Sequence, residues 1–126
     1  MYEHKKILIA DDDDSFLSLY SKIIEKAGFT AIQAHDGEEA ILMATQFKPD
    51  LLVLDIAMPK KDGLAVTDAI RKTPWGADVP IIILTGKNPT DEWLDKLTKS
   101  NTAYYLIKGS QSLDDFIAKI KDILHA

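Results

Sequence analysis

The chain has 126 residues, of which 46% are hydrophobic and none is cysteine, and its formal net charge is -5. This length and composition fit one compact domain with its own core and exclude a disulfide framework or a thiolate metal site. The lack of a signal peptide and of any apolar run of membrane-spanning length predicts a soluble, cytoplasmic protein. The basic residues are scattered along an acidic chain, which argues against direct binding to nucleic acid or to a membrane.

The first predicted strand covers residues 7–10 and stops at four consecutive aspartates, residues 11–14. Four adjacent carboxylates cannot all enter a core, so they are expected at the carboxyl end of the strand. A helix is predicted from Ser15 to about Gly28, capped by Asp13 or Asp14. Its expected inward positions, at helical spacing, are Phe16, Leu19, Tyr20, Ile23, Ile24 and Ala27.

The next strand, residues 31–34, is more polar, as an edge strand would be, and it leads to a helix that ends before Pro49. The inward positions expected for this helix are Ala40, Ile41, Ala44 and Phe47. Residues 51–55 then form an unbroken apolar run that ends in an acid, Asp55. Such a run is typical of the central strand of a parallel sheet, because both faces of that strand are buried.

The second half of the chain repeats the alternation. A helix over residues 64–72 and a loop over residues 73–76 precede a strand at residues 81–84 that ends at Thr85. A further helix is predicted from Thr90, with Trp93, Leu94 and Leu97 on one side. The last strand, residues 103–107, ends at Lys108. Ser112 and Asp115 then stand in capping-box spacing at the start of a final helix.

Five alternations of strand and helix predict an α/β fold with a doubly wound, five-stranded parallel sheet, five helices and the flavodoxin-like strand order 2-1-3-4-5. In that order the carboxyl ends of strands one and three flank a crevice, where Asp11, Asp12 and Asp55 would converge. Clustered carboxylates repel unless a cation compensates them, and an all-oxygen ligand set favours Mg²⁺. For Asp13 and Asp14, only helix capping and a solvated surface are expected.

Thr85 and Lys108 add a hydroxyl and an ammonium group to the same edge of the predicted sheet. Together with the acids they describe a phosphoryl site: a carboxylate can attack phosphorus to give an aspartyl phosphate, while a metal ion and a lysine neutralise the equatorial oxygens. Taken singly, Thr85 and Lys108 are equally well explained as ordinary strand ends. Their joint placement favours the phosphoryl site.

Four separated motifs resemble those of the receiver domain of two-component response regulators, the CheY-like superfamily. They are Asp11-Asp12, Asp55 with Met58-Pro59 and Asp62-Gly63, Thr85, and Lys108. The resemblance covers nearly the whole chain and implies a single receiver domain over residues 1–126. It implies that Asp55 is the phosphoacceptor, and that Asp11, Asp12, Asp55 and the backbone carbonyl of Ala57 bind Mg²⁺. Thr85 and Lys108 would contact the phosphoryl group, and Tyr105 would be the switch aromatic that turns inward as Thr85 moves.

The resemblance also implies partners. A histidine kinase or a histidine phosphotransfer protein would donate the phosphoryl group, docking near residues 15–19, and a downstream protein or a fused output domain would receive the signal. Trp93, Tyr104 and Phe116 are candidate contributors to the output face, with ordinary core packing as the alternative. The chain would be an acceptor with at most slow autodephosphorylation, not an enzyme.

Two alternatives stay open at this point. A pseudo-receiver would bind partners without phosphorylation, although the intact acidic set argues against it. A Mg²⁺-dependent phosphatase of the haloacid dehalogenase type would need a second aspartate where this chain has Ala57.

The chain departs from the family pattern at Gly109, where receivers usually have a proline in a cis peptide. A cis bond to glycine costs about 2.5–4 kcal/mol, so a trans bond or a strained loop is expected. Ala57 has no polar side chain, and Lys87 is basic where some fast-hydrolysing members carry an acid or an amide. Neither can act as a base toward water, which predicts a long-lived phosphoryl group.

Overall fold

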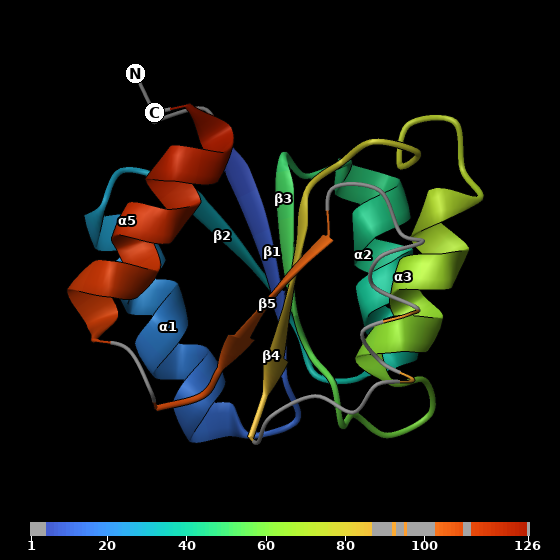
Figure 1. Cartoon of the computed structure of the whole chain (residues 1–126), viewed down its shortest axis with the longest axis horizontal. Helices are drawn as coiled ribbons and strands as arrows, with labels where there is room; N and C mark the ends of the chain where they lie inside the picture. Colours follow the sequence, from blue (N-terminus) through green and yellow to red (C-terminus); the bar gives the residue numbers. More distant parts are fainter. Residues whose placement is uncertain (1–4, 87–91, 93–94, 96–102, 110–111, 126) are drawn as a thin grey trace.

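The computed structural model describes residues 5–86, 92, 95, 103–109 and 112–125 (Figure 1). Its sheet has five parallel strands, in the order β2-β1-β3-β4-β5 that the sequence predicts. The strands are β1 (Lys6–Ala10), β2 (Thr30–Ala34), β3 (Leu51–Asp55), β4 (Ile81–Thr85) and β5 (Ala103–Ile107).

Helices cover both faces of the sheet, as a doubly wound fold requires. In Figure 1, α1 (Asp14–Lys26) and α5 (Leu113–Leu124) lie on one side, and α2 (Gly37–Phe47) and α3 (Gly63–Arg71) lie on the other. The helix predicted around Trp93, Leu94 and Leu97 falls outside the described residues. Within the described part of the chain, no helix is both long and apolar enough to cross a bilayer.

The core consists of two apolar layers, one on each face of the sheet. Every residue of β3 and β4 is buried, whereas β2 is largely open along its length, as predicted for an edge strand. Successive residues of β1 alternate between the layers: Leu8 packs toward α2 and α3, and Ile9 packs toward α1 and α5. The sheet is therefore held rigidly from both sides.

The predicted caps of α1 and α5 are both present. Asp13 is the N-cap of α1, where its carboxylate accepts the backbone N–H groups of Ser15 and Phe16. At α5, the hydroxyl of Ser112 accepts the N–H of Asp115, and the carboxylate of Asp115 accepts the N–H of Ser112, which completes the capping box.

Two of the expected inward positions are wrong. Leu19 is 48% exposed, and Leu17, only two residues earlier, is buried in its place. The buried residues of α1 are Leu17, Tyr20, Ser21 and Ile24, whose i, i+3, i+4, i+7 spacing defines one face of the helix, and Leu19 lies outside that face. Phe47, the last residue of α2, is 37% exposed because the helix ends there and the chain turns away at Lys48.

Phe116, a candidate for the output face, instead follows the alternative of core packing. It has no exposed surface, because it points from α5 into the layer between that helix and the sheet. Tyr104 of β5 is 36% exposed, with the Nζ atom of Lys119 lying 5.1 Å from the centre of its ring. Of Tyr104 and Phe116, the two candidates within the described residues, only Tyr104 is available to a partner.

Candidate functional site

The register of the sheet brings the predicted acids together. Ala10 of β1 pairs with Leu54 of β3, so the residues that follow them, Asp11 and Asp55, leave the sheet side by side. Asp12 joins them, and one carboxylate oxygen from each of the three residues lies within 4.8 Å of the others. Asp11 and Asp55 are buried, whereas Asp12 is exposed. We refer to Asp11, Asp12 and Asp55 as the acidic cluster.

Thr85 and Lys108 reach the same edge through the same register. Leu84 pairs with Asp55, and Thr85 pairs with Ile107, so the ends of β3, β4 and β5 are aligned. The backbone N–H of Lys108 donates a 2.7 Å hydrogen bond to the carbonyl oxygen of Thr85, and Thr85 is buried. The predicted set of Asp11, Asp12, Asp55, Thr85 and Lys108 therefore occupies one end of the sheet.

The side chain of Lys108 spans the acidic cluster. Its Nζ atom lies 2.7 Å from Oδ2 of Asp11 and 3.5 Å from Oδ1 of Asp55. The other oxygen of Asp11, Oδ1, accepts the backbone N–H of Asp13 at 3.0 Å. The lysine is thus a direct counter-charge for two of the carboxylates, and the turn after β1 fixes the orientation of one of them.

The electrostatics of the site follow from burial and crowding. Burial raises the pKa of the Asp55 carboxyl group, and the charge of Asp11 raises it further, while Lys108 and a backbone hydrogen bond from Ala57 act in the opposite direction. Burial alone would lower the pKa of Lys108, but its hydrogen bond and charge interactions with Asp11 and Asp55 outweigh this effect and raise it. The carboxylates therefore hold the lysine in its charged form.

These residues fit a bound Mg²⁺ ion. Three carboxylates and one ammonium group leave a net charge of about -2, which a divalent cation would neutralise. All the candidate ligand atoms of the acidic cluster are carboxylate oxygens, as Mg²⁺ prefers. The exposed Asp12 keeps one side open for the water ligands that this ion retains. The acidic cluster is therefore consistent with the Mg²⁺ site of a receiver domain.

The raised pKa of Asp55 predicts a pH-dependent stability in metal-free protein. An acid whose pKa is higher in the folded state binds more protons there than in the unfolded chain, so stability falls as the pH rises through the folded pKa. Asp55→Asn removes the repulsion between the carboxylates of Asp55 and Asp11, so it should stabilise the metal-free protein by about 1 kcal/mol at neutral pH. Like charges about 4 Å apart repel by up to about 4 kcal/mol, and Lys108 offsets most of that.

Urea unfolding in the presence of a chelator, at neutral and at mildly acidic pH, measures this difference. The advantage of Asp55→Asn should shrink as the pH falls and the wild-type carboxyl group becomes protonated. A variant that is less stable than wild type at neutral pH, or a gap that does not change with pH, would contradict the assignment.

Phe16 is a neighbour of the site that sequence reasoning placed in the core. The Nζ atom of Lys108 lies 4.3 Å from the centre of the Phe16 ring, which is partly buried on the first turn of α1. An aromatic residue at helical spacing gives no sign of such a contact. Only the relative placement of α1 and the end of β5 creates it.

Other predicted residues lie at the edge of the site. Ala57 is exposed in the turn after β3, and Tyr105 is 42% exposed on β5. Gly63, at the start of α3, approaches the end of β3 so closely that an added Cβ atom would lie 2.8 Å from the carbonyl oxygen of Asp55. A larger residue at this position would displace the turn beside the acidic cluster.

The peptide between Lys108 and Gly109 is trans, one of the two alternatives expected. Gly109 has a φ angle of +79°, in the left-handed region that favours glycine. The proline that the family usually carries here could not adopt this angle, because its ring fixes φ near -65°. The loop after Lys108 therefore follows a path that suits glycine.

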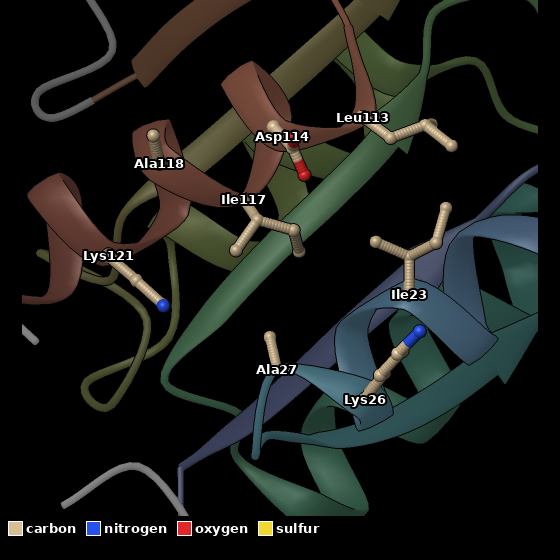
Figure 2. A pocket seen from close by; sticks show the side chains of 8 residues that line it. All are labelled: Ile23, Lys26, Ala27, Leu113, Asp114, Ile117, Ala118 and Lys121. Atoms are coloured by element: carbon tan, nitrogen blue, oxygen red, sulfur yellow. The ribbon is translucent and has the colours of Figure 1, made fainter.

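A hollow of about 470 Å³ lies between α1 and α5, away from the acidic cluster. Figure 2 shows the side chains around it, which are Ile23, Lys26, Ala27, Leu113, Asp114, Ile117, Ala118 and Lys121. None of these residues belongs to the acidic cluster. The hollow has no direct part in the chemistry at the end of the sheet.

Comparison with known proteins agrees with this geometry. The family model described as the response regulator receiver domain matches residues 7–121. Among curated proteins, the chain is 43% identical over 94 residues to the alkaline phosphatase synthesis transcriptional regulatory protein PhoP of Bacillus subtilis, a match that covers 75% of this chain and 37% of PhoP. It is 34% identical over 119 residues to the response regulator MprA of Mycobacterium ulcerans, covering 94% of this chain and 50% of MprA.

Solved structures give the same result. The receiver domain of the Francisella response regulator 1452 has a TM-score of 0.84 and 28% identity, over 97% of this chain and 98% of that one. The chemotaxis protein CheY4 of Vibrio cholerae has a TM-score of 0.86 over 94% of this chain and 98% of its own, at 24% identity, which supports the fold alone. The chain spans half or less of the length of the curated relatives PhoP and MprA. It belongs to the response regulator receiver domain family of two-component signalling.

Proposed function

We propose that the chain is a phosphorylation-controlled switch of a two-component system, in which Asp55 accepts a phosphoryl group from a phosphohistidine of a partner. The observation that carries the proposal is the convergence of Lys108 and the acidic cluster at one end of the sheet. Asp55 is the central member, because it ends the fully buried strand β3 and lies within reach of both neighbouring acids and the lysine.

In the proposed reaction, a carboxylate oxygen of Asp55 attacks phosphorus, an O–P bond forms, and the P–N bond to the donor imidazole breaks. The acidic cluster and the backbone carbonyl of Ala57 would hold Mg²⁺, which would supply positive charge for the phosphoryl oxygens. Lys108 pairs with one of these oxygens. The hydroxyl of Thr85, at the end of the neighbouring strand, hydrogen-bonds to the phosphoryl group after transfer.

The conformational response is proposed to run through Thr85 and Tyr105. Tyr105 is 42% exposed in this structure, so its ring would become more buried if it turned inward as Thr85 moves toward the phosphoryl group. Thr85 and Tyr105 lie on adjacent strands, with Ile83 of β4 paired directly with Tyr105 of β5. The change would therefore appear on the face formed by β5 and its neighbours, where a partner reads it.

The proposed partners lie on two sides of the molecule. The donor, a histidine kinase or a histidine phosphotransfer protein, would approach the acidic cluster and contact α1 near Ser15 and Leu19, which are both exposed.

The output would be a downstream protein or a fused domain. PhoP is named a transcriptional regulatory protein, and RpaA of Synechocystis, about half of whose length the match covers, is named a DNA-binding regulator. We propose no direct contact of this domain, residues 1–126, with nucleic acid or a membrane.

Incubation with acetyl phosphate and Mg²⁺, followed by intact-mass spectrometry, tests the proposal. A switch gains the mass of one phosphoryl group, and the gain disappears when a chelator removes the metal. Release of inorganic phosphate over many turnovers, without a lasting adduct, would indicate a phosphatase. A protein that neither gains mass nor releases phosphate would be a pseudo-receiver, and the proposal would be wrong.

The phosphoryl group is expected to persist for minutes or longer on the isolated domain. Ala57 is exposed near Asp55, and its side chain is only a methyl group, so it cannot position or activate water. Lys87, the other residue on which this expectation depends, lies outside the described residues. After removal of the donor, the decay of the adduct can be followed by mass spectrometry. Ala57→Glu should shorten the lifetime, whereas complete loss from the wild-type domain within seconds would refute the expectation.

A further inference from the structure

We infer that Phe16 is a positioning residue for Lys108: its ring holds the lysine ammonium over the acidic cluster by a cation–π contact. The inference rests on the proposed function, because it assigns Phe16 a part in the phosphoryl transfer to Asp55. The inference adds Phe16 to the site. This side chain has no polar atom, so it would contribute through the face of its ring.

The contact geometry is the first support. The Nζ atom of Lys108 is 4.3 Å from the centre of the Phe16 ring, well inside the distance of about 6 Å at which cation–π attraction acts. The same atom is 2.7 Å from Asp11 and 3.5 Å from Asp55. The ammonium group therefore lies between two carboxylates and one aromatic face, and the lysine side chain is only 26% exposed.

A stack of rings holds Phe16 in place. Its ring lies 3.9 Å from that of Tyr20, one helical turn later, at an interplanar angle of 18°. Tyr20 in turn meets Phe116 of α5 edge to face, with centroids 4.9 Å apart. Phe116 has no exposed surface and Tyr20 is 6% exposed. The partly exposed ring at the site is thus supported by two rings anchored in the core.

The site needs such a support for Lys108. A lysine side chain has four rotatable bonds, and the next residue is Gly109, whose φ of +79° replaces the fixed geometry of a proline. Both carboxylates that now hold the ammonium group would change partners in the working site, since Mg²⁺ engages Asp11 and the phosphoryl group is added to Asp55. The contact with Phe16 involves neither of these carboxylates.

Three variants test the inference through the rate of adduct formation with acetyl phosphate, a small donor that needs no docking on α1. Phe16→Leu removes the ring but keeps an apolar side chain, and Phe16→Tyr keeps the ring. Phe47→Leu makes the same substitution at a partly exposed phenylalanine far along α2. Phe16→Leu should lower the maximal rate about three- to tenfold, with Mg²⁺ affinity unchanged, while Phe16→Tyr and Phe47→Leu should stay within about twofold of wild type.

A double-variant comparison separates positioning from general packing. If Phe16 acts through the lysine, Phe16→Leu should have no further effect on the residual rate of Lys108→Met. An equal slowing in that background, or an equal slowing by Phe16→Tyr and Phe16→Leu, would overturn the inference. Wild-type protein that forms no adduct would instead refute the proposed function. Wild-type and Phe16→Leu proteins that react equally fast would refute the role of Phe16 alone.

Discussion

Asp55→Asn is expected to reduce the phosphoryl adduct below the detection limit of intact-mass spectrometry. The amide oxygen of asparagine is a poor nucleophile and carries no charge, so it cannot attack the phosphorus of acetyl phosphate. The buried neighbour Asp11 cannot easily take its place. Asp11 has no exposed surface, and its two oxygens are engaged by Lys108 and by the N–H of Asp13.

The matched control is Asp68→Asn, which makes the same change at an exposed position of α3. This variant should form the adduct at the wild-type rate and yield. Peptide mapping of the wild-type adduct should locate the phosphoryl group on Asp55. If Asp55→Asn still gains one phosphoryl group at wild-type yield, another carboxylate, most directly the exposed Asp12, is the acceptor, and the assignment is wrong.

The fold and the acidic cluster were predictable because both depend on simple features of the sequence. Unbroken apolar runs such as residues 51–54 are typical of buried strands, and polar residues that follow parallel strands meet at one edge of the sheet. Asp11 and Asp55 are 44 residues apart along the chain, yet the strand order alone brings them side by side. The register then adds Thr85 and Lys108 at the same edge.

The helix faces were less predictable. Helical spacing identifies an apolar stripe, but it does not say which side of that stripe faces the sheet, a second helix or solvent. In α1 the stripe included Leu19, which is exposed, and missed the burial of Leu17. In the same way, Phe16 and Phe116 are both aromatic residues at helical positions, but one contacts the lysine of the site and the other fills the core. These differences depend on how α1, α5 and β5 pack together.

Lys108→Met is expected to change two properties of the site in opposite directions. Adduct formation with acetyl phosphate should slow by about 10²–10³-fold, the usual effect of removing one group that stabilises charge in a transition state. Mg²⁺ should bind more tightly, by about tenfold, because the ammonium group now 2.7 Å from Asp11 no longer competes for the carboxylates. Isothermal titration gives the affinity, and mass spectrometry gives the rate.

The same substitution should destabilise the metal-free protein and not the Mg²⁺-bound protein. Without its lysine, the carboxylate of Asp11 stays buried with one backbone hydrogen bond, at a cost of about 1–3 kcal/mol in the free energy of unfolding, which Mg²⁺ should restore. Lys119→Met, which removes a lysine lying over the ring of Tyr104 instead, should change neither the rate nor the affinity. If Lys108 only covered the end of a strand, Lys108→Met would also leave the rate of adduct formation and the Mg²⁺ affinity unchanged. Opposite shifts in the rate and the affinity would therefore identify Lys108 as a cation that shares its carboxylates with the metal.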